Sequence, residues 1–178
     1  GGPEYDEVFS MQPAQNGGFI LAGVTWSYGA GEGDVWLIRV NNSGDTLWTQ
    51  TYGSSGSESA SSVKRPAGGG YIIAGRTNSF GSGSSDAWVI RTDSSGQFLW
   101  EQSYGGSNND EFSSVQPLSG GGYILGGNTE SFGEGDDDAW LVKTNNIGDT
   151  LWTSSGSSVS RRSPLICSTH RTAGADSR

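Results

Sequence analysis

The chain has 178 residues, among them 30 Gly and 7 Trp, and a formal net charge of −9 at pH 7. Proteins that bind nucleic acid or anionic lipid need a basic face, so this charge argues against both classes. The single Cys excludes an intrachain disulfide, and no apolar run approaches the roughly 20 residues of a membrane helix.

An internal repeat organises the chain. The motif reads GGFILAG at Gly17, GGYIIAG at Gly69 and GGYILGG at Gly121, so that it recurs every 52 residues. The motifs DVW or DAW and LW recur at the same spacing, with no insertion or deletion. We therefore divide the chain into copies at residues 1–52, 53–104 and 105–153, followed by residues 154–178, which do not match the repeat.

Each copy is expected to hold four short strands, which are clearest in the third copy. A mostly polar strand is predicted over residues 110–117, and after a Gly-rich turn an apolar strand over 123–129. The loop SFGEGDD leads to a strand over 138–144, and the turn NNIGD leads to a fourth strand that begins at residue 150. No apolar period of 3.6 residues persists for ten residues, so helix is not expected.

Four short strands in each of several copies are typical of β-propeller blades. The predicted fold is all-β, with three four-stranded antiparallel blades. Propeller rings close with about 4–8 blades, so three blades form either a partial ring or half of an oligomeric ring. The end blades would expose apolar faces. Two alternatives would cover these faces: further blades of a longer chain, or a second copy that completes a six-bladed ring.

Residues 154–178 have a different composition from the repeat. They hold the only Cys and the only His of the chain, Cys167 and His170, and they read SSGSSVSRRSPLICSTHRTAGADSR. We expect this tail to lie outside the fold, as a linker or out-of-frame sequence; a disordered interaction tail is the alternative.

The second copy also carries a resemblance. The run GGYIIAGRTNSFGSGSSDAWVIRTDSSGQFLWEQSYGG resembles the propeller repeats of secreted and cell-surface bacterial and archaeal proteins. The resemblance covers residues 1 to 153. It implies an extracellular or cell-surface location and no particular reaction. It therefore favours a non-catalytic module that binds proteins or glycans or serves as a scaffold.

Acidic residues recur in the loops that follow the second and fourth strands, which meet at one end of each blade. Asp34 and Asp86 each stand two residues before a Trp, where a carboxylate that accepts backbone N–H groups would fix the loop. The third copy concentrates carboxylates, which are the oxygen ligands that Ca²⁺ prefers. The candidate calcium ligands are Glu134, Asp136, Asp137 and Asp138. A solvated acidic loop is the alternative.

The same end of the blades is expected to carry a ligand site. Trp26 stands where the other copies have Asn78 and Glu130, and a position that accepts all three residue types is exposed. An exposed Trp can stack on a sugar ring or anchor a partner protein; a Trp folded over its own blade edge is the alternative. Asp110 and Glu111 complete the set of candidate ligand-binding residues.

The remaining Trp residues recur identically and are interpreted as structural, in the core between blades. They are Trp36, Trp88 and Trp140 in the third strands, and Trp48, Trp100 and Trp152 in the fourth strands.

Catalysis has little support in the sequence. The repeats contain no His and no Cys, which excludes Ser-His-Asp and Cys-His arrangements within them. A glycosidase needs only two carboxylates about 5–10 Å apart, so a fragment of a glycan-active hydrolase or lyase is the alternative function, with Asp34, Asp86 and Glu111 as candidates. No cofactor is expected apart from the calcium considered above.

Overall fold

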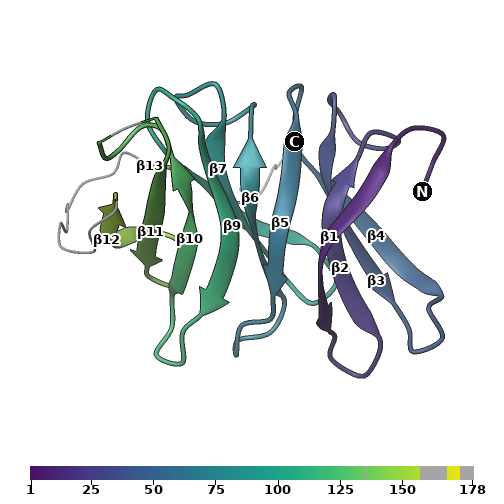
Figure 1. Cartoon of the computed structure of the whole chain (residues 1–178). Coiled ribbons are helices and arrows are strands. Elements are labelled where there is room, and N and C mark those ends of the chain that lie inside the picture. The colour runs from purple at the N-terminus through teal and green to yellow at the C-terminus, as the bar shows by residue number, and fades with distance from the viewer. Residues whose placement is uncertain (135, 157–167, 173–178) are drawn as a thin grey trace, which may run out of the picture.

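The computed structural model describes residues 1–134, 136–156 and 168–172, the last range by its backbone alone (Figure 1). These residues form β-strands and connecting loops without any helix, and hence without a helix that could cross a membrane. The predicted all-β class is therefore confirmed. The strands form three open antiparallel sheets, each of which follows the chain order of its strands.

The strands of sheet 1 are β1 (Asp6–Pro13), β2 (Phe19–Thr25), β3 (Asp34–Val40) and β4 (Thr46–Tyr52). Sheet 2 contains β5 (Glu58–Lys64), β6 (Tyr71–Thr77), β7 (Asp86–Thr92) and β8 (Phe98–Tyr104). Sheet 3 contains β9 (Asp110–Pro117), β10 (Tyr123–Thr129), β11 (Asp138–Thr144) and β12 (Thr150–Ser155). All four strands predicted in the third copy are present. Short strands joined by Gly-rich turns are local features, so a single copy is enough to predict them.

One strand is not among those predicted. Backbone residues Ser168–Thr172 form β13, which pairs antiparallel with β8 and adds a fifth strand to sheet 2. The outer strand of a sheet presents unpaired N–H and C=O groups that accept another strand. The rest of the tail, residues 157–167 and 173–178, lies outside the described residues.

The three sheets stack through the strands that begin each copy. Strands β1, β5 and β9 lie side by side, and β5 and β9 also contact the second and third strands of the preceding sheet (Figure 1). One apolar cluster lies between sheets 1 and 2 and another between sheets 2 and 3. The middle strands of sheet 2 are therefore covered on both faces, and β7 is almost continuously buried. In β11, burial alternates with partial exposure, as in a sheet with one covered face.

Hydrogen bonds between sheets repeat along with the sequence. The backbone N–H of Val63 donates to Ser10 Oγ at 3.1 Å, and one copy later the N–H of Val115 donates to Ser62 Oγ at 3.4 Å. The Tyr104 hydroxyl donates to the carbonyl of Gly148 in the next sheet at 2.6 Å. These contacts fix the offset between neighbouring sheets, which in turn positions the loops at their ends.

A glycine in the second strand of each copy permits a bulge in the first strand. Strand β5 shifts register between Ala60 and Ser62, opposite Gly75. A Cβ on Gly75 would lie 1.9 Å from the carbonyl oxygen of Ser59, which is backbone and cannot move aside. Only glycine allows the two strands to approach so closely at this position.

The recurring Trp residues differ in burial between the two strand positions. Trp36, Trp88 and Trp140 are all buried. Of the fourth-strand residues, Trp100 is buried, while Trp48 and Trp152 are half-buried. Trp140 stacks on Phe112 with ring centroids 5.0 Å apart. Trp48 and Trp100 instead contact the Tyr that begins the second strand of the following sheet, at 6.2 Å in each case.

Candidate functional site

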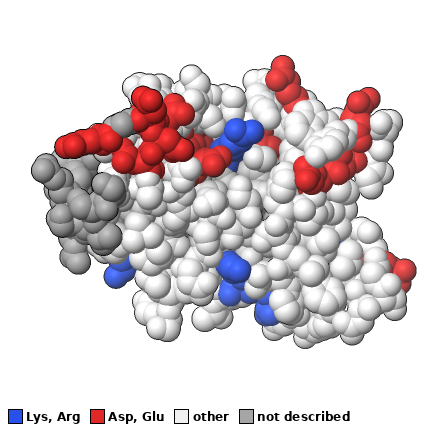
Figure 2. Space-filling view, in the orientation of Figure 1, with Lys and Arg blue, Asp and Glu red and all other residues white. Residues whose placement is uncertain are grey.

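A cavity of about 320 Å³ opens between sheets 2 and 3, at the end where the acidic loops gather. Acidic side chains crowd this end of the molecule, and basic atoms lie among them (Figure 2). The lining residues are all polar or charged: Arg76, Ser85, Asn109, Asp110, Glu111, Asn128, Glu130 and Asp137. A cavity of this composition suits a polar ligand with several hydrogen-bonding groups.

Strand pairing brings the lining residues together. Arg76 lies near the end of β6, and in sheet 3 Glu111 of β9 pairs with Asn128 of β10. A short parallel bridge between Ser85 and Asn109 joins the loop before β7 to the start of β9. Both sheets therefore contribute side chains, and the cavity exists only because the sheets pack against each other.

Apart from Glu111, which matches Glu7 in the first copy, the exposed lining residues stand at positions where all three copies differ. Arg76 and Asn128 occupy the position of Val24 in the first copy. Glu130 occupies the position of Trp26 and Asn78. Structural positions, such as the Trp of each third strand, are the same in every copy. The cavity between sheets 2 and 3 thus has a chemistry that the space between sheets 1 and 2 does not repeat.

Amide groups hold two of the carboxylates in place. The Asn109 side chain donates through Nδ2 to Glu130 Oε2 at 2.9 Å, and Asn128 Nδ2 donates to Asp137 Oδ2 at 3.3 Å. Each of these carboxylates keeps a second oxygen for a ligand. Fixed side chains lose less conformational freedom when a ligand binds, which favours affinity.

Two lining groups have unused hydrogen-bonding capacity. Among the described residues, the exposed Arg76 guanidinium makes no hydrogen bond or ion pair. The Ser85 hydroxyl is buried, with the residue 7% exposed, and it also has no hydrogen-bond partner there. A buried hydroxyl without a partner is costly, so a ligand that bonds to it would relieve that cost.

Asp110 supports the cavity wall. It is buried and accepts hydrogen bonds from the Thr129 hydroxyl, from Ser131 Oγ at 2.6 Å and from the backbone N–H of Gly106 at 3.0 Å. Glu58 accepts equivalent bonds in sheet 2 from Thr77 Oγ1 and other donors. The repeated acid at the start of the first strand therefore ties together the two loops at this end of its sheet.

A second repeated carboxylate lies beside this one. Asp86 Oδ2 accepts the backbone N–H of Gly83 at 2.8 Å, and Asp34 Oδ2 accepts equivalent bonds in the first copy. The other oxygen of Asp86 approaches Asp110 across Gly105, where an added Cβ would lie within 2.6 Å of both carboxylates. Burial raises the pKa of Asp86, and repulsion from Asp110 raises it further, while the backbone donors oppose this shift.

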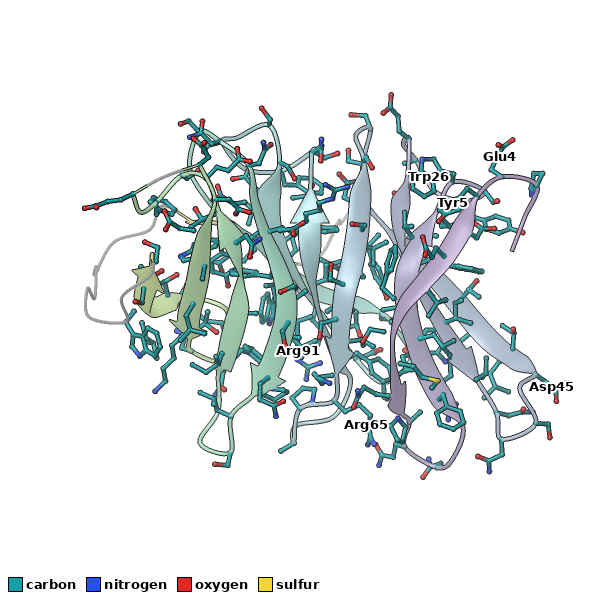
Figure 3. The ribbon with its side chains drawn as sticks, viewed as in Figure 1. Glu4, Tyr5, Trp26, Asp45, Arg65 and Arg91 are labelled. Carbon is teal, nitrogen blue, oxygen red and sulfur yellow. The ribbon has the colours of Figure 1, made fainter. Side chains whose placement is uncertain are left out.

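The other predicted ligand-binding residues lie away from the cavity. Trp26 packs edge to face against Tyr5 at the end of sheet 1, with ring centroids 5.2 Å apart and its side chain 42% exposed (Figure 3). Asn78 is exposed, and its backbone N–H donates to the carbonyl of Ser57. Of the predicted ligand-binding residues, Glu130, Asp110 and Glu111 therefore line the cavity. Trp26 and Asn78, which occupy the position of Glu130 in the other copies, do not line it.

The predicted calcium ligands do not converge. Glu134, Asp136 and Asp137 are exposed, and Asp138 is half-buried below Gly133. Within residues 1–134 and 136–156, no three His, Cys, Asp or Glu side chains are grouped in a way that could hold a metal ion. Only Asp137 of this set reaches the cavity. Calcium binding by this loop stays a prediction.

Arg76, Asn109 and Asn128 were not among the candidates that sequence reasoning selects, although a signal for them exists. Once the copies are aligned, polar residues replace Val24 near the end of an otherwise apolar strand, and they mark a surface that the second and third copies have and the first lacks. What the alignment does not contain is the packing that sets Arg76 beside sheet 3.

Two further cavities, of about 450 and 550 Å³, lie at the opposite end, where turns with Gly, Pro and Ala form most of the lining. Arg91 lines the smaller of the two, and its guanidinium already donates to backbone carbonyls, among them that of Tyr71 at 3.1 Å. This arginine stabilises the turns, so the cavity between sheets 2 and 3 is the stronger candidate.

Comparison with known proteins adds no functional information. A scan against models of protein families finds no match, and a search of curated proteins finds no similar sequence. The function must therefore be argued from the site.

Proposed function

We propose that the three sheets are blades of a β-propeller and that the chain is a non-catalytic, extracytoplasmic binding module. Three antiparallel four-stranded sheets that stack through their first strands support this architecture. The observation that carries the function is the polar cavity between sheets 2 and 3, because its exposed groups other than Glu111 stand where all three copies differ. A purely structural cavity would have equivalents with the same residues between each pair of sheets.

The chemistry of the cavity favours a glycan that carries amino groups. Carboxylates and amides pair well with the hydroxyl groups of sugars, and the lining supplies both kinds of group. The exposed carboxylates of Glu111, Glu130 and Asp137 outnumber the single guanidinium of Arg76, so the cavity attracts positive charge. Arg76 in turn donates to a sugar hydroxyl or ring oxygen. An acidic glycan would meet repulsion from the three carboxylates.

Isothermal titration calorimetry with three oligosaccharides tests the proposal: a glucosamine oligomer, its N-acetylated counterpart and a galacturonic acid oligomer. We expect the glucosamine oligomer to bind most tightly. The Glu111→Gln variant should bind it about tenfold more weakly or worse, because a hydrogen bond to a charged group contributes about 1.5–3 kcal/mol.

Glu32 provides the control, since it is an exposed carboxylate in the loop between β2 and β3 at the same end of sheet 1 and does not line the cavity. Glu32→Gln should leave affinity unchanged. Equal affinity of Glu111→Gln and the unchanged protein, or binding of the acidic oligomer alone, would contradict the proposal. Release of shorter sugars during the titration would instead favour the glycan-active enzyme.

A further inference from the structure

An apolar face of sheet 1 is open. We define the leading face of sheet 1 by Val8, Met11 and Phe19, which are 40%, 55% and 38% exposed. The residues at the same positions in sheets 2 and 3 are at most 5% exposed: Ala60, Val63, Tyr71, Phe112, Val115 and Tyr123. In those sheets the same face packs against the preceding sheet. The side chains at these positions are apolar in all three sheets. The difference in exposure therefore arises because, among the described residues, no sheet packs against this face of sheet 1.

The opposite end of the stack has a complementary face. The trailing face of sheet 3 consists of Ile124 and Leu141, which are half-buried, and Ala139, which is exposed. The same positions in sheets 1 and 2 are at most 1% exposed: Ile20, Val35, Leu37, Ile72, Ala87 and Val89. Each internal interface joins one trailing face to the leading face of the next sheet, so in the described part of the chain one face of each kind has no sheet packed against it.

Polar groups at the two open faces match in the same way. The N–H of Val63 donates to Ser10 Oγ at one internal interface. The corresponding donor on the leading face of sheet 1 is the N–H of Met11, and the corresponding acceptor in sheet 3 is the hydroxyl of Ser114. The two faces therefore fit each other in both apolar shape and hydrogen bonding.

We propose that these faces bind a second copy of this chain. The leading face of each protomer docks on the trailing face of the other, so that two equal contacts related by a two-fold axis cover both of these faces in each protomer. The internal interfaces serve as the template, since they show what this sequence places on each face. One internal hydrogen bond has no counterpart, because Gly156 stands where Tyr104 donates to the next sheet. The contact is accordingly weaker than an internal one.

The docked copy would also complete a second cavity. This second cavity would lie at the contact between protomers, at the place that corresponds to the cavity between sheets 2 and 3. There Asn128 and Asp137 of one protomer face four residues of the other: Tyr5, Asp6, Glu7 and Trp26. Tyr5 and Trp26 form an aromatic pair at the open end of sheet 1 (Figure 3). An aromatic pair beside carboxylate and amide groups suits the face and the hydroxyls of a sugar ring. This second site rests on the proposed function, whereas the contact between copies does not.

Light scattering on a size-exclusion column measures the association directly. We expect the unchanged protein to elute at twice the chain mass of 18.6 kDa and to dissociate on dilution. Met11→Asp places a charge in the centre of the leading face and should give a monomer. Phe9→Ser is the matched control, because Phe9 is 50% exposed on the same strand but corresponds to Ser61 and Ser113, which are outside the apolar clusters. This control should remain a dimer.

Three results would overturn the proposal. A monomer at every concentration would show that the faces do not bind each other, and a ladder of larger species would exclude two-fold closure. Loss of the dimer in Phe9→Ser as well as in Met11→Asp would indicate unspecific apolar association. The cavity between sheets 2 and 3 is intact in Met11→Asp, so glucosamine titration of that variant tests the proposed function separately from the dimer.

Discussion

Phe112 provides the most direct test of how sheets 2 and 3 are held together. Its side chain is fully buried, stacks on Trp140 at 5.0 Å and packs edge to face on Tyr104 at 5.4 Å. Removal of a buried Phe side chain costs about 3–5 kcal/mol. Each aromatic pair contributes a further ~0.5–1.5 kcal/mol beyond its buried area. We therefore expect Phe112→Ala to lower the free energy of unfolding by about 4 kcal/mol or more.

Urea unfolding followed by Trp fluorescence measures this loss. Phe9→Ala is the control, since it removes the same side chain from a half-exposed position on the equivalent strand of sheet 1. Exposed substitutions change stability by less than about 0.5 kcal/mol. A loss below about 1.5 kcal/mol for Phe112→Ala, or a loss equal to that of Phe9→Ala, would refute packing of sheet 3 on sheet 2 through this ring.

Two other predictions concern repeated features. Gly75→Ala should cost about 1–3 kcal/mol in urea unfolding because its Cβ would collide with the Ser59 carbonyl, whereas Gly68→Ala, with no atom within 4 Å, should be nearly neutral; equal effects would contradict the bulge. The raised pKa of Asp86 means that this group stabilises the fold fully below the ordinary Asp pKa of 3.8 and that the stabilisation is lost as pH rises through the raised value. Asp86→Asn should therefore gain stability relative to the unchanged protein as pH rises above 3.8, and a stability difference that does not change with pH would refute the raised pKa of Asp86.

Prediction from sequence succeeds for features that one copy contains. The bounds of β9, β10 and β11 follow from runs of strand-forming residues between Gly-rich turns, and the repeat then extends them to the other copies. Strand β13 is different: its residues match no copy, and its pairing with β8 depends on an open sheet edge far away in the sequence.

The candidate site was only partly predictable. Glu111 and Glu130 are recognisable from the acidic loops, and both line the cavity. Arg76 is not, because nothing in its own copy indicates that it faces sheet 3. Trp26 stands at the same repeat position as Glu130, yet it lies at the open end of the stack and beside Tyr5. The position in the repeat places these side chains at the loop end of their sheet, whereas the neighbouring sheet determines which side chains meet there.

The amino-acid sequence is sufficient to predict three similar sheets, because strand and turn preferences are local and the 52-residue period repeats them. Which apolar faces are covered, and where a polar cavity forms, depends instead on how the sheets pack against one another. Val8 and Phe112 occupy the same position in their copies, yet one is 40% exposed and the other fully buried. Burial requires a second surface: sheets 2 and 3 each pack against the preceding sheet at that position, whereas in the described part of the chain no sheet covers this face of sheet 1.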